Sequence, residues 1–368
     1  MSNPSLVFNS VPSGSLPLPG KHLVVKDLPL PAREGVLVRI DLASLDPFLL
    51  SQLRDPSSTW TYQPALPIGE ALSTSAVGTV VRSDISNLPP GEVVWLARTP
   101  LAVYSFFDAE VAVNPRLVVP IGRIVQETGI HKGHWLGVLG VPGLTGFAGL
   151  YECGQPKAGE TIFISSAAGT VGMTVAYFSK REGLRTVGSA GSAEKVDRLR
   201  GTGLFDEAFV FDRLDSGEAG EKELRRAAPE GIDIHFANVG GVQMRAAAAC
   251  MKVQGRIIVC DALNEYGGGV NTEEPGKSGG GGLDPGWLWQ PVVYKRLTIR
   301  GFLITDLAPK YYESFQKQMY EGIKKDGGLP RIAPLEVVHG LDKAAEAFGN
   351  LFRNGKVMGK LLVQPSRP

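Results

Sequence analysis

Residues 161–181 constrain the fold of this chain more than any other segment. The apolar run Thr161–Ile164 leads into the small residues 165–172, and a helical pattern follows from Met173 to Arg181. This order of strand, small-residue turn and helix is typical of a βαβ unit that binds a dinucleotide. The turn must be small because the pyrophosphate approaches its backbone, and the helix N-terminus offers N–H groups and a positive dipole to that anion.

The turn departs from the usual glycine pattern at one place. When it is aligned with G-x-G-x-x-G, the three glycine positions hold Ala167, Gly169 and Gly172. An ordinary glycine-rich connection between a strand and a helix would look the same, so the assignment depends on support from the next strand.

That next strand favours NADPH over NADH. Residues 185–189 are predicted to form a strand, and an NAD-specific site places an Asp or Glu about 20 residues after the glycines to bind the ribose hydroxyls. Ser189 to Ser192 occupy this place without an acid, and Lys195 follows in the first turn of the next helix. A cation there opposes the helix dipole unless an anion lies between them, which favours a 2′-phosphate over the alternative of a solvated lysine.

Length, charge and cysteine content exclude several classes of protein. The chain has 368 residues, enough for two domains, and a net charge of +1, which gives no reason to expect nucleic acid or an anionic membrane as a partner. Neither a secretory signal nor an apolar run of membrane-spanning length is visible. Three scattered cysteines, Cys153, Cys250 and Cys260, indicate a reduced cytoplasmic protein without a disulfide framework.

No metal centre is expected. The cysteines lack the C-x₂₋₄-C spacing of a structural zinc site. His131 and His134 stand three residues apart, but no cysteine or carboxylate cluster accompanies them, so we expect them at the surface or in a hinge.

The pattern of predicted strands and helices changes near residue 135. Before it, short alternating runs such as Val36–Ile40 and Ala76–Val81 are separated by Pro and Gly. After it, strands and helices alternate, which predicts a parallel, doubly wound sheet. The predicted strands are 161–165, 185–189, 207–210, 232–236, 255–260 and 297–302.

The end of the chain is predicted to return to the first domain. A helix over 311–325 is followed by a Gly-Gly-Leu-Pro break, and strands over 332–338 and 359–363 flank a helix over 342–353. The glycine-rich segment 267–282 follows the fifth predicted strand, at the carboxyl edge where such sheets bind ligands. It is either a lid over the site or a surface insertion.

Several strings, in the right order, resemble one family. They are LGVPGLTGF (139–147), AGSAEKV (190–196), GIDIHFANVGG (231–241), GRIIVC (255–260) and VYKR (293–296). Together they resemble the medium-chain dehydrogenase/reductases, in the zinc-independent branch of prostaglandin reductases and alkenal double-bond reductases (leukotriene dehydrogenase-like). The resemblance covers most of residues 36–363. It implies a GroES-like substrate domain over 1–134 and 327–368, and a Rossmann NADP-binding domain over 135–326.

The resemblance also implies site residues. Ala167, Gly169, Thr170, Val171 and Gly172 would line the pyrophosphate. Ser192 and Lys195 would meet the 2′-phosphate, Asn238 would lie near the nicotinamide half, and Cys260 would begin the segment that ends in the catalytic Tyr266. The alternative for Tyr266 is an aromatic residue that only packs over the cofactor.

Four departures from the family pattern together concern substrate identity more than cofactor use, and one of them is the aromatic string at 99–106, which lacks the usual pattern. Phe211 replaces a tyrosine near the adenosine phosphate, and Phe48-Leu49-Leu50 after Asp46-Pro47 replaces Tyr-Met-Arg. Val357 stands where an asparagine precedes the Gly-Lys pair.

The implied activity is an NADPH-dependent reduction of the C=C bond in an enone or enal. Hydride added to the β-carbon leaves negative charge on the carbonyl oxygen, and the Tyr266 hydroxyl would stabilise it in place of zinc. A carbonyl reductase or alcohol dehydrogenase, and a non-catalytic NADPH-binding protein, are the alternatives. The family expectation is a homodimer formed through the sheet edge at 297–302.

Overall fold

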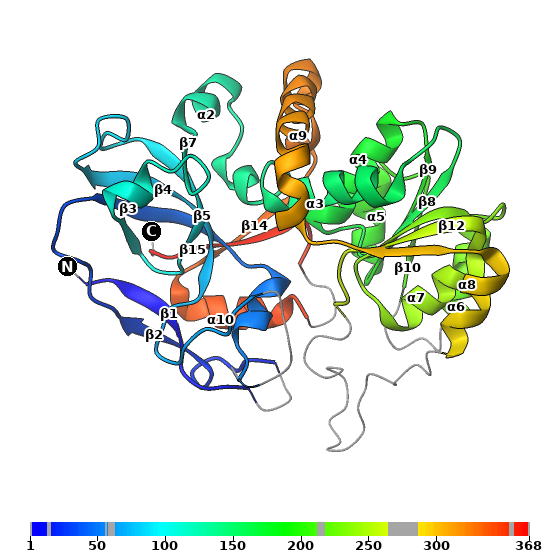
Figure 1. Ribbon diagram of the computed structural model, residues 1–368, viewed down its shortest axis with the longest axis horizontal. Helices are drawn as coiled ribbons and strands as arrows, with labels where there is room; N and C mark the ends of the chain where they lie inside the picture. Colours follow the sequence, from blue (N-terminus) through cyan, green and yellow to red (C-terminus); the bar gives the residue numbers. More distant parts are fainter. Residues whose placement is uncertain are drawn as a thin grey trace. The chain divides into compact units, whose positions relative to one another are not determined.

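The computed structural model describes residues 2–12, 16–55, 57, 63–211, 218–263, 286–352 and 357–366. The chain forms two compact units (Figure 1). The first comprises Met1–Leu136, Leu335–Arg353 and Lys360–Pro368, and the second comprises Gly137–Pro334 and Asn354–Gly359. Residues 327–334, which the sequence-based boundary put in the β-rich domain, therefore lie in the second unit.

The second unit is built on a six-stranded parallel sheet with the order β10-β9-β8-β11-β12-β13. The strands are β8 (Thr161–Ile164), β9 (Arg185–Ala190), β10 (Glu207–Val210), β11 (Ile232–Ala237), β12 (Met251–Val259) and β13 (Thr298–Gly301). The strand order reverses between β8 and β11, as it does at the ligand-binding crevice of a Rossmann fold. The predicted doubly wound sheet is confirmed.

Helices enclose this sheet. They are α3 (Val141–Gly149), α4 (Thr170–Arg181), α5 (Ala193–Gly201), α6 (Glu218–Ala227), α7 (Gly241–Cys250), α8 (Gly286–Lys295) and α9 (Ile304–Asp326). Helices α3, α4 and α9 pack together, and α6, α7 and α8 form a second group (Figure 1). Because both faces are covered, β8 is fully buried and reads as a continuous apolar run rather than an alternating one.

The first unit is rich in antiparallel strands. Its main sheet has the order β14-β15-β3-β4-β5-β7, with β6 also paired to β3, and β1 and β2 form a separate ribbon. These strands are β1 (Pro4–Phe8), β2 (Leu23–Asp27), β3 (Val36–Ser44), β4 (Ser73–Ser83), β5 (Val93–Pro100), β6 (Tyr104–Phe107), β7 (Val118–Pro120), β14 (Leu335–His339) and β15 (Lys360–Gln364). The end of the chain thus rejoins the first unit, because β15 pairs with β3.

Short helices complete the first unit. They are the 3₁₀ turns η1 (Pro47–Gln52) and η2 (Lys132–Leu136), and the helices α1 (Ala109–Ala112), α2 (Gly122–Thr128) and α10 (Leu341–Asn350). In the second unit, a π-helical turn, η3 (Leu150–Gly154), extends α3, and the 3₁₀ turn η4 (Leu329–Arg331) follows α9. None of the helices in the described ranges combines the length and apolar composition needed to cross a bilayer.

Of the two positions expected for His134, the surface is wrong, and the hinge stays a prediction. Its side chain is buried in η2, which packs against β3, β4 and β15, whereas His131 is exposed. Its Nδ1 atom has no hydrogen-bond partner, and burial lowers the pKa of His134 to about 4. The packing of η2 against the sheet is a tertiary contact, which the local spacing of the two histidines does not reveal.

A second buried histidine lies inside the parallel sheet. His235, in β11, donates from Nδ1 to the carbonyl oxygen of Phe163 at 3.2 Å, and its ring stacks on the Phe163 ring with centroids 4.8 Å apart. Burial lowers the pKa of His235 to about 4, from an ordinary value of 6.5. The native state therefore holds this ring neutral.

We expect the stability of the second unit to fall as the pH drops from 6.5 towards 4. The unfolded chain takes up a proton on His235 in this interval and the folded chain does not, which costs about 2 kcal/mol at pH 5. Urea unfolding of wild type and His235→Phe, at pH 7.5 and pH 5, measures the effect. The variant keeps the ring stacking, and its loss between the two pH values should be smaller by about that amount. Equal losses in both proteins would refute the assignment.

Candidate cofactor and active site

Two loops meet at the point where the strand order reverses. Asn238, directly after β11, donates from its backbone N–H to Ser165 Oγ at 2.8 Å, and from Nδ2 to the Ser165 carbonyl oxygen at 2.7 Å. Ser165 is the first residue after β8, and both side chains are buried. Asn238, predicted to lie along the cofactor, is thus first of all a link between the loops after β8 and β11.

The small-residue turn presents the start of α4. Gly169 is the N-cap residue and offers no side chain to the N-terminal N–H groups, and Thr170 and Val171 form the beginning of the helix. Such a helix end binds anions, because its first N–H groups have no partner within the helix. Ser166 has a φ of 51°, a left-handed conformation that is uncommon outside glycine, and its carbonyl accepts the Gly169 N–H at 3.1 Å.

Close packing explains why position 172 keeps the glycine of the motif and why Ala167 can stand in the place of the first glycine. A Cβ atom on Gly172 would lie 2.7 Å from Ala167 Cα, so the helix could not approach the turn with any other residue there. A Cβ on Gly188, in β9, would lie 2.9 Å from Ala167 Cβ. The methyl group of Ala167 therefore occupies space that Gly188 leaves open. Sequence reasoning missed Gly188, although a glycine inside a strand is a sign of close approach.

A segment far along the chain also touches this turn. The Gly359 N–H donates to the Ala168 carbonyl oxygen at 2.8 Å, and Gly359 forms a parallel bridge with Gly169. Gly359 has a φ of 71°, and a Cβ there would lie 2.2 Å from the Pro334 carbonyl oxygen. The sequence predicted a strand at 359–363 but did not indicate this contact. Val357 belongs to the same segment.

The carboxyl end of β9 carries hydroxyl groups and a cation. Ser192 caps α5, and its Oγ accepts the Lys195 N–H at 3.4 Å, which puts the half-buried Lys195 in the first turn. Ser189 Oγ accepts a hydrogen bond from Gln243 Nε2 at 2.9 Å. The neighbouring acid, Glu194, is exposed and pairs with Arg198 in the same helix at 3.3 Å.

Phe211, which stands in the place of a family tyrosine, is a core residue. Its ring is buried next to Gly220 of α6, where a Cβ would lie 2.3 Å from the ring. Its backbone N–H donates to the Ala190 carbonyl oxygen at 3.0 Å, so it ties the end of β10 to the end of β9.

The last predicted site residues follow β12. The backbone N–H of Cys260 donates to the Ala237 carbonyl oxygen at 2.9 Å. Burial raises the pKa of the Cys260 thiol above the ordinary range, so the thiol stays protonated. Tyr266 and the glycine-rich segment 267–282 lie outside the described residues.

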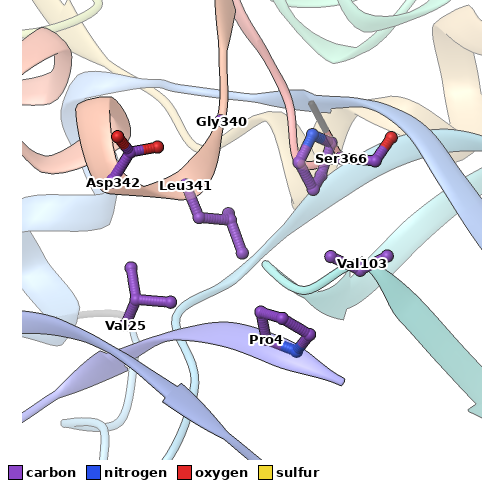
Figure 2. Close-up of a pocket in the computed structure, with 8 residues that line it drawn as sticks. Pro4, Val25, Val103, Gly340, Leu341, Asp342 and Ser366 are labelled. Carbon is purple, nitrogen blue, oxygen red and sulfur yellow. The ribbon is translucent and has the colours of Figure 1, made fainter. Parts of the chain in front are cut away.

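The first unit has an apolar hollow of its own, with a volume of about 290 Å³ (Figure 2). It lies between β1, β2 and α10, where Pro4, Val25 and Leu341 line it. None of the predicted site residues takes part in it.

Comparisons with known proteins identify the family of this chain. Residues 5–112 match the family model described as the N-terminal domain of oxidoreductase. The chain is 35% identical to NADP-dependent oxidoreductase RED1 of Cochliobolus heterostrophus, over 98% of this chain and 97% of that protein. It is 33% identical to the NADP(+)-dependent 2-alkenal reductase of Nicotiana tabacum, over 94% of this chain and 92% of the relative.

A solved structure covers both units. The crystal structure of CurA from Vibrio vulnificus, in complex with NADPH, matches with a TM-score of 0.83 and 28% identity, over 99% of this chain and 100% of that one. This chain belongs to the medium-chain dehydrogenase/reductase family. Its relatives place it in the branch of the alkenal double-bond reductases, which confirms the resemblance, and it is an NADP-dependent oxidoreductase.

The residues present fit NADPH. The start of α4 supplies N–H groups beside a turn that Gly172 and Gly188 keep small, which suits a pyrophosphate. No acid stands between Ser189 and Ser192 to repel a 2′-phosphate, and Lys195 is close by in sequence.

Proposed function

We propose that this chain is an NADPH-dependent ene reductase, which reduces the C=C bond of an α,β-unsaturated ketone or aldehyde by hydride transfer to the β-carbon, without zinc. The observation that carries the proposal is the small-residue turn at 165–172, together with the neighbouring strand β9, which ends without the Asp or Glu of an NAD-specific site. Similarity to a 2-alkenal reductase over nearly the whole chain supports the substrate class.

The geometry of the second unit supports the proposed cofactor contacts. Gly169, Thr170, Val171 and Gly172 at the start of α4, with Ala167 beneath them, would hold the pyrophosphate. Ser192 and Lys195 would bind the 2′-phosphate, and Asn238 and Cys260 would border the nicotinamide half. When bound, NADPH supplies the hydride; the protein supplies orientation and exclusion of water.

Tyr266 is the proposed catalytic residue. Negative charge grows on the carbonyl oxygen as the β-carbon accepts hydride, and a hydrogen-bond donor aimed at that oxygen stabilises it. A tyrosine hydroxyl suits this role, because its ordinary pKa of about 10 keeps it protonated at neutral pH. The segment that carries Tyr266 begins at the carboxyl end of β12, the edge of the sheet where Rossmann folds bind their ligands.

The product of the reaction tests the proposal. Purified protein with NADPH and an enone should give the saturated ketone, and a chelator should not change the rate. An allylic alcohol would point instead to a carbonyl reductase, and NADPH binding without turnover to a non-catalytic protein.

Tyr266→Phe should lower kcat by roughly 100-fold, the typical effect of losing one oxyanion donor, with the Kd for NADPH unchanged. Tyr312→Phe, at a tyrosine exposed on α9, is the control.

The 2′-phosphate assignment makes a separate prediction. Lys195→Ala should weaken NADPH binding by roughly 10-fold, because one charge-assisted contact is lost, and leave NADH binding unchanged. Fluorescence titration with both dinucleotides measures this. Lys222→Ala, at an exposed lysine of α6, should change neither. An equal loss for NADPH and NADH would show that Lys195 acts elsewhere.

We also propose a homodimer through the edge of the parallel sheet. All four residues of the edge strand β13 are exposed, and α8, which packs on the adjoining strand β12, exposes Trp289, Val293 and Tyr294. An exposed strand edge with apolar neighbours favours pairing with another chain. Light scattering should give twice the mass of the chain, and Ile299→Lys should give the monomer. Val210→Lys, on the opposite edge strand β10, should remain a dimer; a monomeric wild type would refute the proposal.

We propose a cytoplasmic location because of the state of the cysteines. All three, Cys153, Cys250 and Cys260, are free thiols, as is usual in a reducing compartment.

A further inference from the structure

The first unit contains a buried lysine whose charge is matched by one carboxylate. The Lys360 side chain is 4% exposed and its Nζ donates to Asp46 Oδ1. Ser44 Oγ donates to the other carboxylate oxygen, and Thr74 Oγ1 donates to the Ser44 carbonyl oxygen at 2.7 Å. Asp46 is also the N-cap residue of η1, but its carboxylate does not cap that turn. The carboxylate is instead committed to Lys360 and Ser44.

Stability alone is a weak reason for such a pair. Removing a lysine and a carboxylate from water costs several kcal/mol per ion, and apolar replacements of buried pairs are often neutral or stabilising. What an ion pair does provide is a fixed position for the backbone that carries it. The place of Lys360 in the chain is therefore informative.

The chain passes from the second unit to the first at the peptide bond between Gly359 and Lys360. On one side of this bond, the Gly359 N–H donates a hydrogen bond to the Ala168 carbonyl oxygen of the small-residue turn. On the other side, Lys360 is held by Asp46. The other nearby crossing, between Pro334 and Leu335, runs beside it: Leu335 pairs with Lys360 at the start of β14 and β15, and the Pro334 carbonyl lies against Gly359.

We propose that Lys360 is a positioning residue for the cofactor turn: its ion pair with Asp46 fixes the chain one residue after Gly359, and Gly359 in turn fixes the backbone at Ala168 and Gly169. This rests on the proposed binding of the pyrophosphate at that turn. In this proposal neither charge binds the cofactor directly. Their effect reaches it through a single peptide unit and a single backbone hydrogen bond.

The test replaces the lysine with an apolar side chain of similar length. Lys360→Met should raise the Kd for NADPH by roughly 10-fold in a fluorescence titration, the equivalent of one lost backbone hydrogen bond at the turn. Its kcat at saturating NADPH should change much less. Binding of adenosine 2′-monophosphate, which has the 2′-phosphate but no pyrophosphate, should be unchanged. A loss of affinity for both ligands would indicate general damage to the site and overturn the proposal.

Variants of Asp46 and a control variant of Lys132 distinguish an effect on the cofactor turn from an effect on folding. Asp46→Asn should reproduce the effect of Lys360→Met, the double variant should be no worse than either single one, and Lys360→Arg should recover part of the affinity. The double variant buries no unpaired charge, so it remains informative if a single variant folds poorly. Lys132→Met removes another lysine–aspartate pair of the first unit, with Asp41 at 2.7 Å, and should leave NADPH affinity unchanged.

Three further outcomes are decisive. Lower resistance to urea in Lys360→Met with an unchanged Kd for NADPH would show that the pair serves folding alone and would overturn the proposal. A wild type that binds NADPH but reduces no enone would refute the proposed reaction, and the Kd values would still decide the role of Lys360. A wild type that binds no NADPH would overturn both.

Discussion

The close approach of α4 to the turn before it is the constraint on which the cofactor site depends. Gly172 can hold no side chain because Ala167 Cα occupies that space, and Gly188 leaves room for the Ala167 methyl group. The turn is thereby pressed between its own helix and the neighbouring strand β9. A turn confined in this way keeps its backbone N–H groups fixed in direction, which an anion site needs if binding is not to cost conformational entropy.

Polar contacts confine the same turn from its other sides. Asn238 holds Ser165 with two hydrogen bonds, and Gly359 holds Ala168 with one. The buried Asn238 amide thus joins the loop after β11 to the loop after β8. Ser166 lies between these two contacts in the chain and has a left-handed φ of 51°. Such conformations persist only where the surroundings determine them.

The sequence allowed the local elements to be predicted, but not the long-range contacts that hold them together. The buried strands of the parallel sheet are apolar runs bounded by helical patterns, so strands such as β8 and β11 were recognisable from composition and length. Residues 46 and 360 are separated by 314 positions, and nothing in the local pattern joins them. The contact of Gly359 with the turn and the burial of His134 were missed for the same reason. Gly188 is the exception, since a glycine within a predicted strand was a local signal.

Residues 48–50, which depart from the family pattern that the sequence resembles, directly follow Asp46 and Pro47. Asp46 begins η1, and its contacts with Ser44 and Lys360 fix where that turn starts. The residues that follow differ from the family pattern: Leu49 is buried, while Phe48 and Leu50 remain partly exposed. A rigid start with altered side chains beyond it is how a common fold acquires a different substrate without disturbing its cofactor site. We therefore expect Phe48 and Leu50 to bear on substrate preference more than the turn at 165–172 does.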